Sequence, residues 1–487
     1  MKTAIFQFAS GSIHFATSLE ILKDNSLAGD ELFYCLWGSK TKYPGRMSVG
    51  FENFNGIAPR FVKKLVKHAA PDVVFINDIA FDHIWVSKMT DSLYEVISNA
   101  SSISLLKDVN LTGITPGAAL ANEITTLTKN RNIDLSKNQI LTRILIESYL
   151  QVYNAATKFI LENKIERIFL FNGRFIHERA VWDAAKAIGR QVILFETTRN
   201  RYFLRKEGFH SRINNQKVML EHWKNSDLDT EKRIEIGSKY FSELRSRSRP
   251  FFTETKQDFK ITKPYFVYFS SSDDEAVGFW DEWNEPLGEQ VECIKKLKKI
   301  FDEQNTFELL VRLHPNLKNK SESQKSGWLT IKNSKSTRVI GPDQQVSSYE
   351  LLDNSVGTIS FGSTIGLESA FALKPSLVIA DCGYDLLGVV DKAENWSDIS
   401  KWILSRHKIN TETLMSRRNN ACIRGFFIAT GGIPFKYSSL VDKGLGAWDA
   451  TFFDGLQITS NSIAYNYRKL ISRIKFRRIN LLIHDLL

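Results

Sequence analysis

The hydrophobic pattern of this chain alternates between two periods. Short apolar, β-branched runs, typical of buried strands, alternate with longer stretches in which apolar residues recur every three or four positions. Predicted helices separate the first-half strands, the longest spanning about Gln139–Glu162. The predicted strands of this half are Thr3–Phe8, Glu31–Leu36, Asp72–Ile76, Arg167–Phe171 and Gln191–Phe195. This alternation is typical of βαβ units and predicts a parallel sheet.

The same alternation restarts after a strongly charged stretch, Lys224–Lys260, which we interpret as a helix followed by an interdomain linker. The second-half strands are Tyr265–Phe269, Phe307–Leu313, Thr337–Ile340, Thr358–Ser360 and Ser376–Ile379, with helices at Gln290–Gln304, Ser347–Asp353 and Ile365–Leu373. The predicted fold class is therefore α/β, with two Rossmann-like domains facing an interdomain cleft. Ligands of such domains bind at the carboxyl ends of the strands.

The charge balance favours anionic partners. The chain of 487 residues carries 65 Lys and Arg against 54 Asp and Glu, a formal net charge of +11. Nucleotides, acidic glycans, lipid phosphates and anionic membranes fit this excess. Nucleic acid is the weakest option, because no recognised nucleic-acid-binding module is present.

The basic excess is concentrated in the last twenty residues. Arg468–Leu487 holds six basic residues and one acidic residue, with apolar positions at Ile471, Ile474, Ile479 and Leu482. A basic amphipathic helix of this kind lies on an anionic membrane or packs back on the N-terminal domain. Both alternatives stay open on sequence alone.

Two further features bear on the compartment. The four cysteines lie far apart with no Cys-x-x-Cys pair, which indicates neither a zinc site nor a disulfide framework. No apolar run reaches the roughly 20 residues that a bilayer-spanning helix needs. We therefore expect a cytoplasmic protein, peripheral on the inner membrane if the basic tail binds lipid.

The first candidate site follows the strand at Phe307–Leu313. Arg312 and His314 project near its carboxyl end, and Pro315 turns the chain. A guanidinium fork and an imidazole at this place suit the phosphate oxygens of a nucleotide. The alternative is an ordinary strand-ending turn with a hydrogen-bonded histidine.

The second candidate site follows the strand at Thr358–Ser360. Gly362 lets the backbone approach a ligand, and Ser363 and Thr364 stand where the next helix begins. N–H groups at a helix start bind phosphate without a metal, and Glu368, one turn on, is placed to accept hydrogen bonds from ribose hydroxyls. A helix cap with no ligand is the alternative.

Taken in order, these motifs resemble the C-terminal half of several nucleotide-binding GT-B families. The shared features are His-Pro after one strand, the Ser363–Glu368 motif at the next strand–helix turn, and Lys374-Pro375. The families include Kdo-type and other capsule-polysaccharide transferases, teichoic-acid glycerophosphotransferases and nucleotide-sugar epimerases. In capsule-type transferases a stretch similar to Ser270-Ser271, followed by Asp and Glu, opens the donor domain. The resemblance thus implies that Ser270 and Ser271 belong to the donor site; a solvated capping run is the alternative.

The first half carries a third group of candidates. Asn172 and Gly173 form a turn that aims Arg174 at the cleft, and Arg179 is placed to pair with Glu196 in the next strand. A buried structural Arg–Glu pair is the alternative. With Arg199, this pattern is similar to the N-terminal half of bacterial capsular-polysaccharide transferases, although Thr197-Thr198 stand where Arg-Gly is expected.

The first strand–helix turn faces the acceptor in a GT-B enzyme. His14 follows the first predicted strand and is a candidate general base. Glu196 is the second candidate for that role. A lone histidine at a helix start is otherwise a cap or a surface residue.

These patterns predict an acceptor-binding domain at 1–250, a donor-binding domain at 251–435 and a tail at 436–487. The predicted function is a metal-independent glycosyltransferase with no cofactor, in which a nucleotide sugar is a co-substrate and the acceptor is a surface glycan or lipid-linked glycan. An epimerase, a glycerophosphotransferase and a non-catalytic assembly partner are the alternatives. Epimerases favour Ser-Gly-Gly where this chain has Ser363-Thr364-Ile365, which counts against the first of these.

Overall fold

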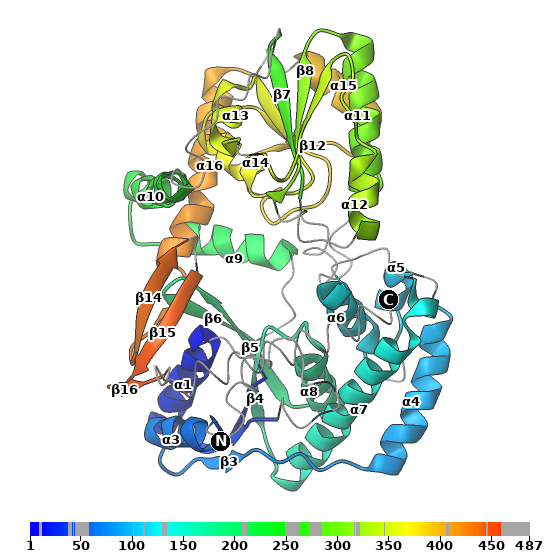
Figure 1. The fold of residues 1–487 in the computed structure, drawn as a ribbon. Coiled ribbons are helices and arrows are strands. Elements are labelled where there is room, and N and C mark those ends of the chain that lie inside the picture. Colours follow the sequence, from blue (N-terminus) through cyan, green and yellow to red (C-terminus); the bar gives the residue numbers. More distant parts are fainter. Residues whose placement is uncertain are drawn as a thin grey trace. The chain divides into compact units, whose positions relative to one another are not determined.

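A computed structural model describes residues 1–8, 12–37, 41, 43, 58–100, 102–110, 113–128, 134–206, 212–248, 261, 263–271, 285–315, 317, 322–344, 346–405, 409–444 and 447–458. The chain divides into two compact units (Figure 1). Unit 1 comprises residues 1–209 and 432–487, and unit 2 comprises residues 210–431. Each is an α/β domain built on a mostly or wholly parallel sheet, so the predicted fold class of two Rossmann-like domains, as in GT-B proteins, is confirmed.

Unit 1 contains a seven-stranded sheet in the order β13-β6-β5-β4-β1-β2-β3. The strands are β1 (Lys2–Phe6), β2 (Glu31–Cys35), β3 (Val74–Ile76), β4 (Arg167–Phe171), β5 (Gln191–Thr198), β6 (Arg201–Arg205) and β13 (Ile433–Pro434). β1 to β5 are parallel, whereas β6 and β13 are antiparallel to their neighbours. β1 and β4 are adjacent although two strands separate them in the sequence, so the strand order reverses at that pair.

Helices cover both faces of this sheet. They are α1 (Ser12–Leu27), α3 (Ala58–Ala69), α4 (His83–Ser98), α5 (Ile103–Lys107), α6 (Pro116–Thr128), α7 (Gln139–Glu162) and α8 (Ile176–Ala187), with a short 3-10 turn at Leu135–Lys137. Alternate residues of β1 point to opposite faces. Ile5 packs with α1 and α3, and Phe6 lies edge-on to Phe159 of α7. Ala4, Ile5 and Phe6 of β1 are therefore all apolar, because both faces of the strand are buried there.

The chain returns to unit 1 after residue 431. An antiparallel sheet of β14 (Ser438–Gly444), β15 (Ala447–Phe453) and β16 (Leu456–Gln457) packs against α1, with Ala450 and Phe453 fully buried. Glu20 of α1 is fully buried and accepts hydrogen bonds from Lys436 N, Tyr437 N and Ser438 Oγ at 2.7–2.9 Å. Residues 436–458 of the predicted tail are thus part of unit 1, whereas the basic segment 468–487 lies outside the described residues.

Unit 2 contains a six-stranded parallel sheet in the order β12-β11-β10-β7-β8-β9. The strands are β7 (Tyr265–Phe269), β8 (Glu308–Arg312), β9 (Thr337–Ile340), β10 (Gly357–Ser360), β11 (Ser376–Val378) and β12 (Asp391–Lys392). This is the strand order of a Rossmann fold. The order reverses between β7 and β10, as it does between β1 and β4 in unit 1.

The helices of unit 2 are α9 (Arg212–Lys224), α10 (Thr230–Ser248), α11 (Gln290–Gln304), α12 (Glu322–Leu329), α13 (Ser348–Asn354), α14 (Ile365–Phe371), α15 (Trp396–Ser405) and α16 (Thr411–Thr430). On one sheet face Phe266 and Tyr268 pack with α11, α12 and α15. On the other face Tyr265 and Val267 pack with α13.

The domain boundary differs from the predicted one at residue 250. α10 falls in the stretch interpreted as helix and linker, but it packs tightly on α16 within unit 2. A Cβ added at Gly237 would lie 2.3 Å from Cys422 O, and one added at Gly425 would lie 2.2 Å from Gly237 O, so only glycine allows this close approach. The boundary therefore falls at 209–210, before α9, because α9 and α10 bury their apolar faces in unit 2.

All four cysteines are buried and free. Among the described helices, none combines the length and apolar character needed to cross a membrane.

A group of buried polar side chains surrounds the start of α8 in unit 1. Glu178 is 1% exposed, and its Oε1 atom has no hydrogen-bond partner within the described part of the chain. Burial raises the pKa of Glu178 to about 8, and the nearby carboxylate of Glu123 raises it further. Glu178 is therefore protonated and neutral in the folded protein at pH 7.

This raised pKa predicts a pH-dependent stability of unit 1. The folded state keeps the Glu178 proton up to about pH 8, whereas the unfolded chain releases it near pH 4.5. The wild type should therefore lose stability as pH rises from about 4.5 to 8, by up to about 1.4 kcal/mol per pH unit. Glu178→Gln, which is neutral at every pH, should lack that slope. Urea unfolding of both proteins between pH 5 and pH 8.5 measures it, and parallel pH profiles would contradict the prediction.

Candidate functional site

In unit 2, three of the sequence-predicted segments meet at the carboxyl edge of the sheet. They follow the adjacent strands β8, β7 and β10. The backbone N–H of His314 donates to Ser270 Oγ at 2.7 Å, and Ser271 Oγ donates to the carbonyl of Phe361 at 2.9 Å. Ser270 and Ser271 therefore join the His314 turn to the Phe361–Thr364 turn, directly at the reversal of strand order between β7 and β10.

Ser271 also binds Gln290 at the start of the following helix, α11. Ser271 N donates to Oε1 of Gln290 at 2.8 Å, and Gln290 Nε2 donates back to Ser271 O at 3.3 Å. Ser270 is buried, so its hydroxyl serves the connection between loops rather than solvent. The acidic residues Asp273 and Asp274 lie outside the described residues.

Arg312 and His314 occupy different environments. Arg312 is 3% exposed, its Nη1 atom donates to the carbonyl of Gly341, and burial lowers its pKa. Its Nε atom has no hydrogen-bond partner among the described residues. His314 is half-buried beyond the strand end, with its backbone fixed by Ser270. His314 is thus the more exposed of the two candidates, whereas Arg312 is enclosed within the fold.

The turn after β10 begins with a left-handed residue. Gly362 has φ 87°, and a Cβ there would lie 3.1 Å from Asp381 O and 3.2 Å from Cys382 Cβ, so both the angle and the space require glycine. Ser363 is half-buried and Thr364 is exposed. Both hydroxyl-bearing residues therefore stand at the ligand-accessible end of the strand.

Two expectations for this turn need correction. Thr364 occupies the N-cap position of α14, but its side chain makes no capping hydrogen bond. α14 has seven residues, and its start is tightly wound. The N–H groups of Gly366 and Leu367 therefore already bond the carbonyls of Ser363 and Thr364. Two of the helix N–H groups that were expected to face a ligand are thus already bonded within the helix start, and the Thr364 hydroxyl does not cap it.

Glu368 already has a partner. Its Oε2 atom accepts a hydrogen bond from the hydroxyl of Tyr349. Burial raises the pKa of the Glu368 carboxyl, while the Tyr349 hydrogen bond and the charges of Arg245 and Arg424 lower it. The second carboxylate oxygen is the one that a ribose hydroxyl would reach.

In unit 1, the candidates gather at the other reversal of strand order. His14 lies in the first turn of α1, its ring centroid is 4.2 Å from that of Phe171, and its Nδ1 atom is 2.9 Å from Thr197 Oγ1. Phe171 ends β4, and Thr197 belongs to the end of β5. His14, Asn172 and Glu196 therefore come from the carboxyl ends of three adjacent strands, β1, β4 and β5.

Asn172 organises this group. It has φ 55°, and its Nδ2 atom donates to Glu196 Oε1. Its Oδ1 atom accepts from Arg174 Nε at 2.7 Å and Arg174 N at 3.2 Å. An asparagine tolerates the left-handed conformation here and bonds both charged neighbours, which a glycine would not do.

The two candidate bases differ in their electrostatics. Burial lowers the pKa of His14 to about 4, so its ring is neutral at pH 7 but weakly basic. Burial raises the pKa of Glu196, against the lowering effects of Arg174, Arg205 and the Asn172 hydrogen bond. Because a carboxyl with a raised pKa is a stronger base, Glu196 suits proton abstraction better than His14 does.

The predicted pairing of Arg179 with Glu196 is wrong. Arg179 is 2% exposed, and its Nη1 atom donates to Thr115 Oγ1 at 3.3 Å. Burial lowers its pKa to about 10, and the nearby Asp183 opposes that shift. Asp183 in turn accepts from Thr115 N at 2.9 Å and from the Tyr149 hydroxyl. Arg179 is one turn into α8 and points into the α7–α8 interface rather than along the strand edge, so its role is structural.

Arg199 lies in the two-residue turn between β5 and β6, with φ 48°. Arg205 of β6 lies close enough to Glu196 for their charges to interact, a pairing that the sequence did not indicate. In the sequence, Arg205 stands in a basic run next to aromatic residues. The fold brings it near Glu196 because β6 pairs back onto β5.

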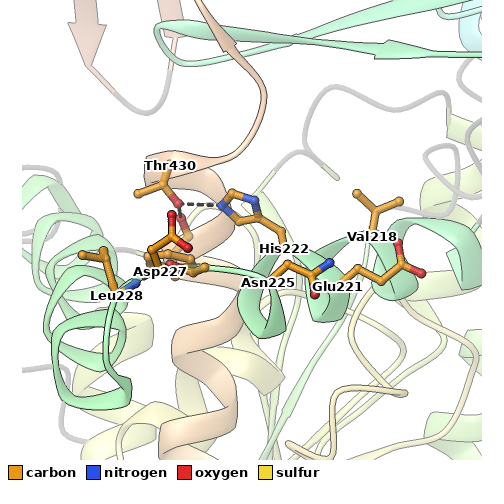
Figure 2. A pocket seen from close by; sticks show the side chains of 9 residues that line it. Val218, Glu221, His222, Asn225, Asp227, Leu228 and Thr430 are labelled. Carbon is orange, nitrogen blue, oxygen red and sulfur yellow. Dashed lines mark hydrogen bonds between the residues drawn. The ribbon is translucent and has the colours of Figure 1, made fainter.

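Unit 2 also contains a surface pocket of about 560 Å³ (Figure 2). His222 ε-nitrogen lies 2.8 Å from Thr430 Oγ1, and the imidazole ring stacks on Phe426 at 5.3 Å. The lining comes from α9, the α9–α10 connection and α16, and consists of Val218, Glu221, His222, Asn225, Ser226, Asp227, Leu228, Phe426 and Thr430. It includes two carboxylates and no Lys or Arg, so it does not suit a nucleotide phosphate.

Within the described residues, no group of three or more His, Cys, Asp or Glu side chains is arranged to hold a metal ion.

No protein-family description and no curated protein match this sequence. Weak similarity to solved structures exists. The Kdo 2,4 transferase domain of KpsC from Thermosulfurimonas dismutans is 11% identical, with 53% of this chain and 79% of that chain covered and a TM-score of 0.35. A putative UDP-N-acetylglucosamine 2-epimerase from Listeria monocytogenes is 11% identical, with 88% and 93% covered and a TM-score of 0.31. The UDP-GlcNAc 2-epimerase of Methanocaldococcus jannaschii, solved with UDP-GlcNAc and UDP, is 12% identical, with 89% and 100% covered and a TM-score of 0.31.

Proposed function

We propose that this protein is a glycosyltransferase that moves a sugar from a nucleotide-activated donor to a growing surface polysaccharide of the capsule or lipopolysaccharide type. In this proposal unit 2 binds the donor and unit 1 activates the acceptor. The supporting observation is that His314, Ser363 and Thr364 share the carboxyl edge of unit 2, at the reversal of strand order where such sheets bind ligands.

The donor contacts follow from this geometry. His314, with the Ser363 and Thr364 hydroxyls, bonds the phosphate oxygens, and the buried charge of Arg312 adds electrostatic attraction from behind. Glu368 accepts from a ribose hydroxyl through its second oxygen while Tyr349 holds the first. Hydroxyls, an imidazole and a fixed positive charge bind phosphate without a divalent ion, so metal-independent transfer belongs to the proposal.

The acceptor half of the proposal assigns proton removal to Glu196. Its carboxylate takes the proton of the attacking acceptor hydroxyl while that oxygen forms the bond to the anomeric carbon of the donor sugar. The nucleotide leaves with the electron pair of the broken bond. Asn172 fixes the orientation of Glu196, and the charges of Arg174 and Arg205 oppose the rise in its pKa that burial causes.

The donor site predicts nucleotide binding that depends on His314. A thermal-shift panel of CMP, CDP, UDP, GDP and dTDP should identify one stabilising nucleotide, by about 2.7 kcal/mol at a hundred times its Kd. His314→Ala should weaken its binding about tenfold or more, because one charge-assisted hydrogen bond is lost. EDTA should change neither result.

The matched control is His222→Ala, which removes a histidine of the same unit from the pocket in Figure 2. Equal loss of affinity in both variants would contradict the donor site. If no nucleotide stabilises the wild type, the glycosyltransferase proposal is wrong and the protein is a non-catalytic assembly partner. If the protein interconverts a free nucleotide sugar without acceptor, it is an epimerase.

The acceptor site predicts a distinctive pH profile. A general base works only when ionised, so kcat/KM should rise with pH through the raised pKa of Glu196, above 4.5. If His14 is the base, the rise should instead lie near pH 4. Glu196→Gln should lower kcat by about a hundredfold or more, whereas Glu166→Gln, an exposed residue at the opposite sheet edge, should leave it unchanged. Full activity of Glu196→Gln would remove Glu196 from the mechanism.

The acceptor in this proposal is a glycan or lipid-linked glycan at the inner face of the cytoplasmic membrane, and the basic segment 468–487 tethers the enzyme there. Its support is the sequence alone: six basic residues, each contributing about 1 kcal/mol near an anionic surface. Removing the residues after Asn466 should abolish co-sedimentation with anionic liposomes at low salt and leave the melting temperature unchanged. A large drop in melting temperature with unchanged co-sedimentation would assign the segment to the protein core instead.

A further inference from the structure

The turn that follows β10 rests on a second segment, residues 381–386, which follows β11. The hydroxyl of Tyr384 donates to the carbonyl of Ser363, and a Cβ added at Gly362 would lie 3.1 Å from Asp381 O and 3.2 Å from Cys382 Cβ. Tyr384 is 1% exposed, and a Cβ added at Gly366 would lie 2.5 Å from its hydroxyl. The position of the Gly362–Ser363 turn therefore depends on where residues 381–386 lie.

The far side of this segment is fixed by α9. Arg212 Nη1 donates to both oxygens of Asp385, at 2.6 and 2.5 Å, and its Nη2 atom lies 3.5 Å from Asp381. One guanidinium thus bridges two carboxylates four residues apart. Gln216, one turn further along α9, donates to Asp385 Oδ1 at 3.0 Å and accepts from Leu386 N at 2.7 Å.

Lys392 completes the network. Its ammonium bonds Asp381 and lies 3.6 Å from Asp385, so two cations balance two carboxylates. The Asp381 and Asp385 side chains are 3% and 1% exposed and that of Arg212 is 8% exposed. Buried charges of this kind contribute little net stability compared with apolar side chains of similar size. Their planar, directional hydrogen bonds do, however, specify one geometry.

We propose that Arg212, Gln216 and Asp385 are positioning residues for the donor-phosphate turn, acting through Asp381, Cys382 and Tyr384. The inference rests on the proposed donor site and deepens it. α9 is the first described helix after the chain leaves unit 1 at 209–210. A displacement of the start of α9 is therefore transmitted to Gly362 and Ser363, which links donor binding to the segment that joins the two units.

The test compares Arg212→Lys with Arg417→Lys. Lysine keeps the charge but lacks the planar guanidinium that donates to both oxygens of Asp385 while it faces Asp381. Arg417 makes a comparable two-bond pair with Asp391, at 2.8 and 2.6 Å, in the same unit but without contacting residues 381–386, so it is the matched control. Tyr384→Phe removes only the hydroxyl that holds Ser363 and serves if Arg212→Lys fails to fold.

Two readouts are measured at matched thermal stability: hydrogen exchange of a peptide covering residues 361–367, and the Kd and KM for the nucleotide selected by the panel. Arg212→Lys and Tyr384→Phe should exchange faster in that peptide and raise Kd and KM about tenfold with kcat within about threefold of wild type. Arg417→Lys should change neither readout.

The outcomes separate this inference from the proposed function. Unchanged exchange in Arg212→Lys and Tyr384→Phe, or the same change in Arg417→Lys, overturns the positioning role even if nucleotide binds. Faster exchange confined to the two test variants, with no nucleotide bound by the wild type, supports the link from α9 to the turn but removes the donor site. Faster exchange with unchanged nucleotide affinity overturns the claim that the network serves donor binding.

Discussion

Both sheets depend on the same constraint, the reversal of strand order beside the central strand. In unit 2, α11 follows β7 on one face of the sheet, whereas α14 follows β10 on the opposite face. Connections that diverge in this way leave the carboxyl ends of the two strands uncovered, and polar groups there stay reachable. The same reversal occurs between β1 and β4 in unit 1. The candidate residues collect at these two places because helices cover both faces of the rest of each sheet.

Buried charges hold the segments behind these edges. Glu20 receives three hydrogen bonds from the returning chain, Asp183 binds Thr115 and Tyr149, and Arg212 bridges two aspartates. In each case the desolvation of a charged group is offset by several directed bonds. Each group also joins segments far apart in the sequence, so the networks specify which parts of the chain lie together. Glu178 is the exception, because its Oε1 atom has no hydrogen-bond partner in the described part of the chain and burial raises its pKa to about 8.

Burial divides the candidate residues into those that are enclosed within the fold and those at the accessible ends of the strands. Arg312 and Arg179 are buried and hydrogen-bonded within the fold, whereas His314, Ser363 and Thr364 stand at the accessible end of the strands. In unit 1, Asn172 connects Arg174 to Glu196 and keeps the carboxylate oriented. A guanidinium in a motif is therefore not by itself a phosphate contact, since its depth decides what it touches.

The sequence by itself determined the elements whose signal is local. The apolar runs predicted β4, β7 and β9 at their observed bounds, and the helical patterns predicted α7 and α11 at theirs. The hydrophobic periods of strands and helices depend only on residues close together in the sequence. The order of motifs also placed His14, Asn172, Ser271 and Ser363 after strands, and a parallel sheet necessarily gathers such residues at one edge.

Only the tertiary structure decided the rest. The structure places α9 and α10 in unit 2 and residues 432–458 in unit 1. Arg179 bonds Thr115 and interacts with the charge of Asp183 rather than that of Glu196. Arg212 bridges Asp381 and Asp385. Arg179 and Asp183 lie in the same helix, α8, but the Thr115 that both contact comes from outside it, and in the Arg212 network the partners lie 169 and 173 positions apart. A side chain's partner is set by which helices and strands pack together and by the cost of leaving a buried charge unpaired, and neither quantity is contained in the local pattern of the chain.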